Sequence, residues 1–374
     1  MTDPKEVLGL RERVAALDRE ILERLDQRAK LSKRIHALAE TGTSIDVNES
    51  EWLSGLVGQS SGEMPRESLR AIFGEIRAAA RGIEQPARVA YVGAEGGFCH
   101  QTALAHFGAT MTGITCPGAA EALDEVVRGR AAFAVLPYES SVDGLIQPSV
   151  SALSKTELVV VAERVTPAVY HLMSRGVSTA DVEKVYATAL AHAACQRFLD
   201  AELPRVSVID VRSPVVAAEL ARDESLSAAI VPEACGRSAG LESLRENVAD
   251  DSDLQMRFAI ASGRPAMKSG NDVTCILFSV DDQPGSLFGV LRHFAERGLN
   301  LRKLQSRPVS HPSWDYVFYV ELGAHVTERA VVTALEAIKR TTKYLKVLGS
   351  FPVASSQAEG SKPSASKPNA TSGE

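Results

Sequence analysis

A glycine-rich turn near the middle of the chain is one place where an anion could bind. Residues 88–92 (RVAYV) form a short apolar run, and residues 93–98 (GAEGGF) follow it before a helical stretch at about 99–107. The backbone N–H groups at the start of such a helix can receive an anion. The turn matches neither a dinucleotide fingerprint nor a P-loop, so we expect no nucleotide and no cofactor.

A lone arginine in LQMRFAI (residues 254–260) is a second candidate for chemistry. Arg257 precedes an apolar run typical of a buried strand, and Met256 stands immediately before it. A guanidinium can grip a carboxylate with two parallel hydrogen bonds, whereas a thioether has no proton to donate. Met256 is therefore either an ordinary core side chain or a replacement for a reactive group.

The composition argues against several kinds of partner. Five scattered cysteines form no CxxC pair, so we expect neither a metal site nor a disulfide framework. The net charge of −6 shows no basic excess, and nucleic acid is not an expected partner. No apolar run approaches the roughly 18 residues of a membrane span, and the charged N-terminal residues do not resemble a secretory signal. We expect a cytoplasmic protein with no membrane partner.

A long amphipathic helix is predicted over residues 6–39. Apolar residues recur at spacings of three and four, and basic residues occupy the other side. The narrow apolar seam cannot be buried by one helix, so we expect a helical dimer. Two shorter helices are expected at about 46–57 and 65–84. The basic residues of the long helix are Arg11, Arg13, Arg24, Arg28, Lys30, Lys33 and Arg34.

Strand-like and helical stretches alternate over residues 87–263, which predicts an α/β unit with largely parallel strands. Ligands in such units bind beyond the carboxyl ends of the strands. The turns expected to line a site are 93–98, 137–144, 187–195 and 255–258. Strands are expected at 88–92, 132–136, 158–162, 168–173, 183–187, 206–210 and 228–231, and helices at 99–107, 118–128 and 190–202.

The C-terminal part has two regions. Residues 272–353 show the order βαββαβ, which is typical of a ferredoxin-like unit. Residues 354–374 consist almost entirely of small, polar and charged residues, which predicts a disordered tail.

Several motifs, in this order of units, resemble the bifunctional chorismate mutase–prephenate dehydratase family. The resemblance implies a multidomain protein with all-α mutase helices (1–85), an α/β two-lobed, periplasmic-binding-protein-like dehydratase unit (87–263) and an ACT regulatory unit (272–353). It also implies a role in L-phenylalanine biosynthesis, from chorismate through prephenate to phenylpyruvate, with phenylalanine as effector and a homodimer or larger homo-oligomer. The motifs are YVGAEGGFCHQTALAHFG (91–108), AVLPYESSVDG (134–144), PGSLFGVL (284–291), LNLRKLQSRP (299–308) and VLGSFP (347–352).

The resemblance assigns a mutase site and marks departures from it. Arg11 and Arg28 match the arginines that grip the substrate's two carboxylates, and Asp46 and Glu84 match the acidic and ether-facing positions. Two cations of the family pattern are missing, because their positions hold Ala39 and Glu49. Loss of one preorganised donor costs on the order of 10²–10³ in rate.

The dehydratase-like positions depart further. The matching site residues are Glu139, Ser140, Met256, Arg257 and Phe258, with Met256 at the position of a proton-handling threonine. Other polar positions of the family hold Gly97, Cys99, Ala187, Thr188 and Ala194. Such a cleft is drier than the family pattern, and desolvating a dicarboxylate in it is unfavourable. We therefore expect dehydration to be lost or altered.

The ACT motifs depart least. The resemblance assigns phenylalanine binding to the first motif, Gly285, Ser286 and Leu287, and to the second, Gln305, Ser306, Arg307 and Pro308.

Three hypotheses stay open for this chain. It is an ordinary bifunctional enzyme, an enzyme with a repurposed site that acts on prephenate or a chorismate analogue (for example by decarboxylation without aromatisation), or a non-catalytic phenylalanine-sensing paralogue.

Overall fold

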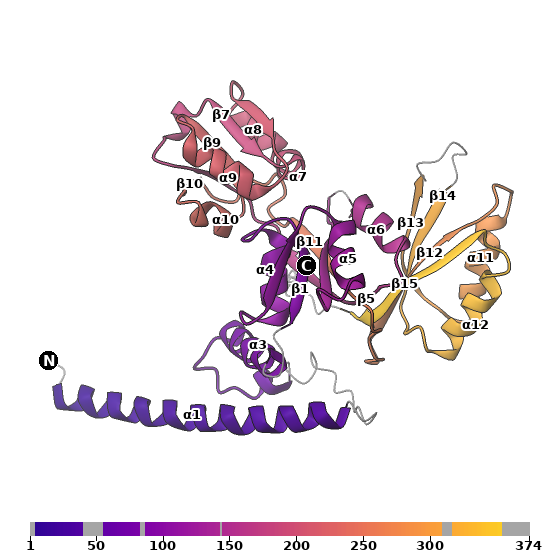
Figure 1. Ribbon diagram of the computed structural model, residues 1–374, viewed down its shortest axis with the longest axis horizontal. Coiled ribbons are helices and arrows are strands. Elements are labelled where there is room, and N and C mark those ends of the chain that lie inside the picture. Colours follow the sequence, from indigo (N-terminus) through magenta and orange to yellow (C-terminus); the bar gives the residue numbers. More distant parts are fainter. Residues whose placement is uncertain (1–3, 40–54, 83–86, 143, 309–315, 354–374) are drawn as a thin grey trace, which may run out of the picture.

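The computed structural model describes residues 4–39, 55–82, 87–142, 144–308 and 316–353. Figure 1 shows a helical region, a two-lobed α/β region and a third unit beside its first lobe, in the order expected. The predicted tail, most of the predicted helix at 46–57, and the positions Asp46, Glu49 and Glu84 lie outside the described residues. Within the described ranges, every helix is too short or too polar to span a lipid bilayer.

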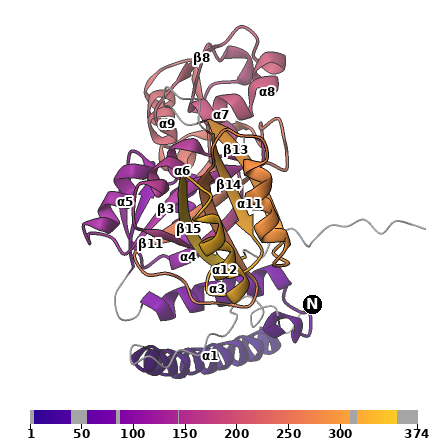
Figure 2. The ribbon, with the colours of Figure 1, turned by 90° about the vertical axis from the view of Figure 1, so that its right-hand side faces the viewer.

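The helical region leaves its apolar seam uncovered. Helix α1 (Pro4–Ala39) confirms the long predicted helix, and α3 (Arg66–Gly82) lies between it and the rest of the chain (Figures 1 and 2). The side chains of Val14, Ile21 and Ile35 are 56–67 % exposed. An amphipathic helix is normally stabilised by packing of its apolar stripe, and this stripe has only part of that packing within one chain.

The first lobe is a mixed sheet rather than a largely parallel one. Strand β1 pairs in parallel with β2 and β3, as predicted, but β11 runs antiparallel between β3 and β5. The chain leaves the sheet at β5, builds the second lobe, and returns in the middle of the sheet, which reverses the direction of β11. The elements of the first lobe are β1 (Arg88–Val92), α4 (Phe98–Phe107), β2 (Thr112–Cys116), α5 (Ala119–Val127), β3 (Phe133–Ser140), β4 (Gly144–Leu145), α6 (Gln147–Ser154), β5 (Val159–Pro167) and β11 (Gln255–Ser262).

The second lobe is a five-stranded sheet in the order β10-β6-β9-β7-β8. The predicted helix at 190–202 is interrupted at Cys195, whose φ of −121° is not helical. Two chain segments connect the lobes, and they are hydrogen-bonded to each other from Ala168 N–H to Leu254 O (2.9 Å) and from Val248 N–H to Tyr170 O (2.9 Å). The elements of the second lobe are β6 (His171–Ser174), the 3-10 helix η1 (Thr179–Asp181), β7 (Lys184–Ala187), α7 (Ala189–Ala194), α8 (Gln196–Glu202), β8 (Ser207–Asp210), α9 (Pro214–Asp223), β9 (Ser227–Val231), α10 (Glu233–Ser238) and β10 (Glu242–Arg245).

The third unit has the predicted βαββαβ order. Its helices cover one face of a four-stranded sheet, and the core between them includes Ile276, Phe294 and Ile338. The elements are β12 (Asp272–Ser279), α11 (Ser286–Ala295), β13 (Leu301–Pro308), β14 (Tyr316–Leu322), α12 (Arg329–Ile338) and β15 (Tyr344–Pro352).

The third unit and the first lobe share one ten-stranded sheet, which the sequence did not predict. Strand β15 pairs in parallel with β5 at Gly349 and Val160. A Cβ atom at Gly349 would lie 2.2 Å from the carbonyl oxygen of Val160, so a glycine is needed for this approach. The open face of the third unit also packs on the first lobe, where the Tyr138 and Tyr319 hydroxyls are 3.0 Å apart. The two units form a continuous body.

Candidate active site

A small cavity lies between the two lobes, where three of the four predicted turns meet. It leaves about 20 Å³ for a water-sized molecule. The turns at 137–144, 187–195 and 255–258 all contribute to its wall. Its lining residues are Ser140, Val142, Tyr170, Leu190, Ala193, Ala194, Leu254 and Met256.

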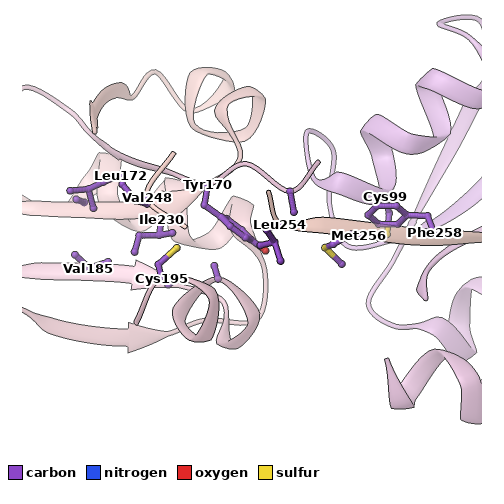
Figure 3. Close-up of a cluster of buried hydrophobic side chains, with 14 of the residues drawn as sticks. Cys99, Tyr170, Leu172, Val185, Cys195, Ile230, Val248, Leu254, Met256 and Phe258 are labelled. Atoms are coloured by element: carbon purple, nitrogen blue, oxygen red, sulfur yellow. The ribbon is translucent and has the colours of Figure 1, made fainter. Parts of the chain in front are cut away.

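Met256 bridges the two lobes at this cavity. It is 3 % exposed and belongs to a core cluster that contains side chains of both lobes. Figure 3 shows it between Tyr170 and Leu254 on one side and Cys99 and Phe258 on the other. Phe258, two residues along the same strand, is fully buried in the same core. Met256 is thus both a packing residue and part of the cavity wall.

The polar groups of the cavity wall are few. Ser140 is 2 % exposed, and its Oγ accepts a hydrogen bond from the Val142 N–H (3.2 Å). Tyr170 is also buried, and its ring makes an edge contact with Phe98. Sequence reasoning missed Tyr170. Tyr170 falls inside the strand predicted at 168–173, and Pro167, immediately before that strand, is the signal that could have marked a crossing between lobes.

The segment at 187–195 supplies structure rather than polar groups. Ala187 is fully buried in β7, and the Thr188 side chain caps α7 by accepting from the Ala191 N–H (3.3 Å). His192, on α7, is half-buried, and its Nδ1 lies 3.0 Å from the Asp210 carboxylate.

Arg257 points away from the cavity, which corrects the hypothesis that it binds a ligand carboxylate there. Successive side chains of a strand lie on opposite faces, so Arg257 faces the third unit while Met256 faces the cleft. Its Nη1 donates to Glu139 (2.6 Å) and to Glu321 (2.8 Å), and its Nε and Nη2 donate to Glu163. Lys303 completes this charged cluster through an ion pair with Glu139.

The charge of Arg257 is therefore neutralised inside the protein. Burial alone would lower the pKa of its guanidinium, but the carboxylates of Glu163 and Glu321 more than offset this and raise it. The predicted site residues Glu139 and Arg257 are brought together, but by an internal ion-pair network. Ser140 and Met256 are the predicted pair that faces the cleft.

The glycine-rich turn lies where the lobes approach each other. Gly93 and Gly96 have φ of +91° and +82°, and a Cβ at Gly96 would lie 3.2 Å from Cα of Cys235 in the second lobe. The Gly96 N–H donates to His100 Nδ1 (3.0 Å), so part of the expected anion-binding surface already has an internal partner.

The mutase-like residues of one chain are far apart. Arg11 is exposed, whereas Arg28 is half-buried and lies 3.4 Å from the Ile76 carbonyl of α3. They are separated by 17 residues on one straight helix, which corresponds to about 26 Å. A single chorismate cannot span that distance, so the two arginines of one chain cannot serve one site.

The effector motifs of the third unit are at different places. Gly285, with φ of +87°, precedes α11, and Ser286 and Leu287 begin that helix. On β13, Gln305 and Arg307 point toward the first lobe, Ser306 is exposed, and Pro308 ends the strand. Among the described side chains, no group of three or more His, Cys, Asp or Glu could hold a metal ion.

Comparisons with known proteins agree with this architecture. The prephenate dehydratase family model matches residues 89–266, and the ACT domain model matches residues 275–340. A bifunctional chorismate mutase/prephenate dehydratase of Aquifex aeolicus is 35% identical over 357 residues, covering 94% of this chain and 99% of the relative. The enzyme of the same description from Stutzerimonas stutzeri is 30% identical, covering 95% and 100%.

Solved structures show the same fold for the dehydratase and ACT parts. A prephenate dehydratase of Arthrobacter aurescens in complex with L-Phe has a TM-score of 0.64 at 29% identity, covering 71% of this chain and 90% of that one. A structure described as a quorum quenching acylase has a TM-score of 0.61 at 25% identity, covering 72% and 98%. The fold alone therefore does not fix the reaction. The near-complete match to the relatives shows that this chain belongs to the bifunctional chorismate mutase/prephenate dehydratase family.

Proposed function

We propose that this chain acts in L-phenylalanine biosynthesis on chorismate and prephenate, with a second step that no longer proceeds as efficient dehydration. The observation that carries the proposal is the wall of the interlobe cavity, where Met256 stands beside Ser140 among apolar side chains. Family membership supports the substrates, and the chemistry of the wall supports the altered step.

Dehydration of prephenate requires the ring carboxylate and the ring hydroxyl to leave together. Departure of hydroxide needs a proton donor or a strong hydrogen bond at the hydroxyl. Met256 offers no proton, and Leu190, Ala193 and Leu254 add apolar surface around it. Arg257, the nearest cation along the strand, is held by three carboxylates on the opposite side. A bound prephenate would therefore find little help for the loss of hydroxide.

Loss of carbon dioxide places a weaker demand on the wall. Decarboxylation is favoured when a carboxylate moves from water into a less polar site, because the charged ground state is desolvated there. The electron pair of the broken C–C bond passes into the ring, the ring gains a proton from water, and the hydroxyl stays in place. The apolar wall thus favours decarboxylation without aromatisation over dehydration. This is the repurposed alternative, and the lining of the cavity is the observation that favours it.

The mutase step requires two chains. The rearrangement is pericyclic, so its site must bind and orient a dianion, and arginine forks suit the two carboxylates. Arg28 of one chain and Arg11 of a second chain can meet only if two α1 helices pack together. The exposed seam of α1 supplies the apolar surface for such a homodimer. We propose a homodimer as the smallest active unit, with Ala39 and Glu49 slowing the step, and a cytoplasmic location.

The ACT unit is proposed to bind phenylalanine as an effector. Gly285 opens α11 in a left-handed conformation, and β13 carries Arg307, a cation suited to an amino-acid carboxylate. The second-motif residue Gln305 keeps an acceptor for the amino group.

Product analysis tests the proposal. Purified protein is incubated with chorismate and then with prephenate, and products are followed by ultraviolet absorbance and mass spectrometry. Slow formation of prephenate from chorismate, together with a non-aromatic decarboxylated product or little phenylpyruvate, is expected. Rapid phenylpyruvate formation would refute the altered second step. No turnover of either substrate, with calorimetric phenylalanine binding, would support the sensing paralogue instead.

A further inference from the structure

Side chains of one strand of the ACT unit bind a segment of the first lobe, and we call this set of contacts the grip. Residues 303, 305 and 307 alternate along β13, so their side chains share one face of the strand. Lys303 forms an ion pair with Glu139. The Gln305 side chain lies against Gly144, where an added Cβ would come within 3.3 Å of its Nε2.

The third side chain of this face reaches further along the same segment. Arg307 donates to the carbonyl oxygen of Leu145 and to Gln147 Oε1 (2.6 Å). Its Nε is buried and has no hydrogen-bond partner among the described residues. We call residues 139–142 and 144–147 the clamped segment. It contacts every other residue of β13 from Lys303 to Arg307, which include two of the predicted effector residues.

The clamped segment is also part of the cleft wall. It carries Ser140 on the cavity side, and the Ser141 N–H donates to the Gln255 carbonyl (2.9 Å) next to Met256. The Ile146 N–H donates to the Tyr138 carbonyl (2.9 Å), which closes the segment on itself. A displacement of this segment toward or away from β13 would therefore move the Ser140 side of the cavity.

Charge balance makes Lys303 central to this contact. Three carboxylates, of Glu139, Glu163 and Glu321, surround Arg257, and each of their side chains is 15 % exposed or less. Lys303 is the second cation, and it contacts Glu139 alone in this cluster. Without Lys303, three poorly solvated carboxylates share the one guanidinium of Arg257. Glu139, which has lost its second cation, is then stabilised most by turning toward water.

We propose that Lys303 and Arg307 are positioning residues for the cleft, although they belong to the ACT unit. They hold the clamped segment in the place that forms the Ser140 wall. An effector carboxylate that binds Arg307 competes with the Leu145 carbonyl for the same guanidinium. Effector binding and retention of the segment therefore oppose each other. This regulation of the cleft rests on the proposed function, whereas the grip itself does not.

Hydrogen exchange followed by mass spectrometry tests the grip. Lys303→Met is compared with Lys346→Met, whose lysine also joins the ACT unit to the first lobe but pairs with the fully exposed Glu157 (3.2 Å). Lys303→Met is expected to accelerate exchange in peptides covering 138–147 by about tenfold or more, while Lys346→Met changes it by less than about twofold. Lys303→Arg is expected to restore most of the protection.

The same experiment can overturn the proposal. Unchanged exchange in the folded Lys303→Met protein, or equal acceleration in Lys346→Met, would show that β13 does not hold the segment. If Lys303→Met does not fold, Arg307→Gln replaces it. Faster exchange is then expected at Ile146, and unchanged exchange there would overturn the proposal. Calorimetric unfolding confirms that each variant is folded.

Phenylalanine separates the grip from the proposed effector role. Added L-phenylalanine is expected to bind, by calorimetry, and to accelerate exchange of the clamped segment by at least about twofold. Absence of binding would remove the effector from the proposed function while leaving the variant comparison decisive for the grip. Binding with unchanged exchange in 138–147 would contradict the opposition between effector and segment.

Discussion

The two faces of strands β3 and β11 have opposite characters. On the cleft face, Ser140 and Met256 border a small apolar cavity. On the ACT face, the neighbouring residues Glu139 and Arg257 belong to an ion-pair cluster that reaches β13 and β14. Adjacent residues on each strand therefore face either a nearly uncharged cavity wall or a buried cluster of charged side chains.

The difference shows which task each face performs. The charged face joins the ACT unit to the first lobe, and all of its cationic groups have protein partners. The cleft face borders a small cavity and holds few groups that transfer protons. The charge near the cleft therefore says little about catalysis in it.

Breaking the charged face should have the largest effect. Arg257→Met leaves three clustered carboxylates without their shared cation and is expected to lower the free energy of unfolding by about 3–5 kcal/mol. Urea denaturation measures this. The control is Arg237→Met, whose arginine pairs with Glu233 on the exposed surface and should cost about 0.5 kcal/mol or less. Equal effects of the two changes would mean that the cluster contributes no special stability.

The sheet junction is a second test of the ACT face. Gly349→Ala puts a methyl group into the Val160 backbone and should destabilise the protein by about 1–3 kcal/mol. Gly289→Ala in α11 is the matched change, because an added Cβ there meets nothing within 4 Å. It should be neutral or stabilise by up to about 1 kcal/mol. A tolerated Gly349→Ala would indicate that the two sheets are not joined as described.

Changing the cleft face should affect stability less and should not recover function. Met256→Thr removes buried apolar volume and is expected to cost about 1–2 kcal/mol, with Met256→Leu costing less than about 1.5 kcal/mol. Dehydration should not return, because Ala187, Ala194 and Ser140 also differ from the family pattern. Phenylpyruvate formation from prephenate is the measurement, and substantial recovery by this single change would show that Met256 alone accounts for the altered step.

The smallest expected effect is a pH dependence on the cleft side of the sheet. Burial raises the pKa of the Cys99 thiol to about 12. The unfolded thiol has a lower pKa, so the folded state binds the proton more tightly and the stabilisation is complete below the unfolded pKa. It is lost as pH rises from there toward 12.

Comparison with Cys99→Ala isolates this group. The stability difference between the native protein and Cys99→Ala should shrink by about 1 kcal/mol between pH 8 and pH 9.5. Denaturation at the two pH values measures it. A difference that stays constant or grows would show that Cys99 does not titrate in this way.

The order of units and most elements were predictable because their signals are local. The periodicity of α1, the glycine turn before α4 and the βαββαβ order all depend on nearby residues. The long-range arrangement of the strands was not predictable. The insertion of β11 into the first sheet and its joining to β15 through Gly349 depend on pairings between distant segments, which periodicity does not encode.

The candidate site was predicted in part. Three turns met at one cavity as expected, and Ser140 and Met256 line it. Arg257 was predicted as a site residue, but its side chain lies on the face opposite the cavity, as adjacent positions of a strand require. Its carboxylate partners come from three other strands, and no local pattern connects Glu163 or Glu321 with it.

Steady-state conversion of prephenate to phenylpyruvate tests the central claim most directly. The native protein is assayed beside the 35% identical relative from Aquifex aeolicus under the same conditions, with calorimetry to confirm that prephenate binds. A phenylpyruvate kcat at least about 100-fold below that of the relative is expected, consistent with loss of a proton-handling group. A kcat equal to that of the relative would contradict the account, because it would mean that the apolar wall at Met256 supports full dehydration.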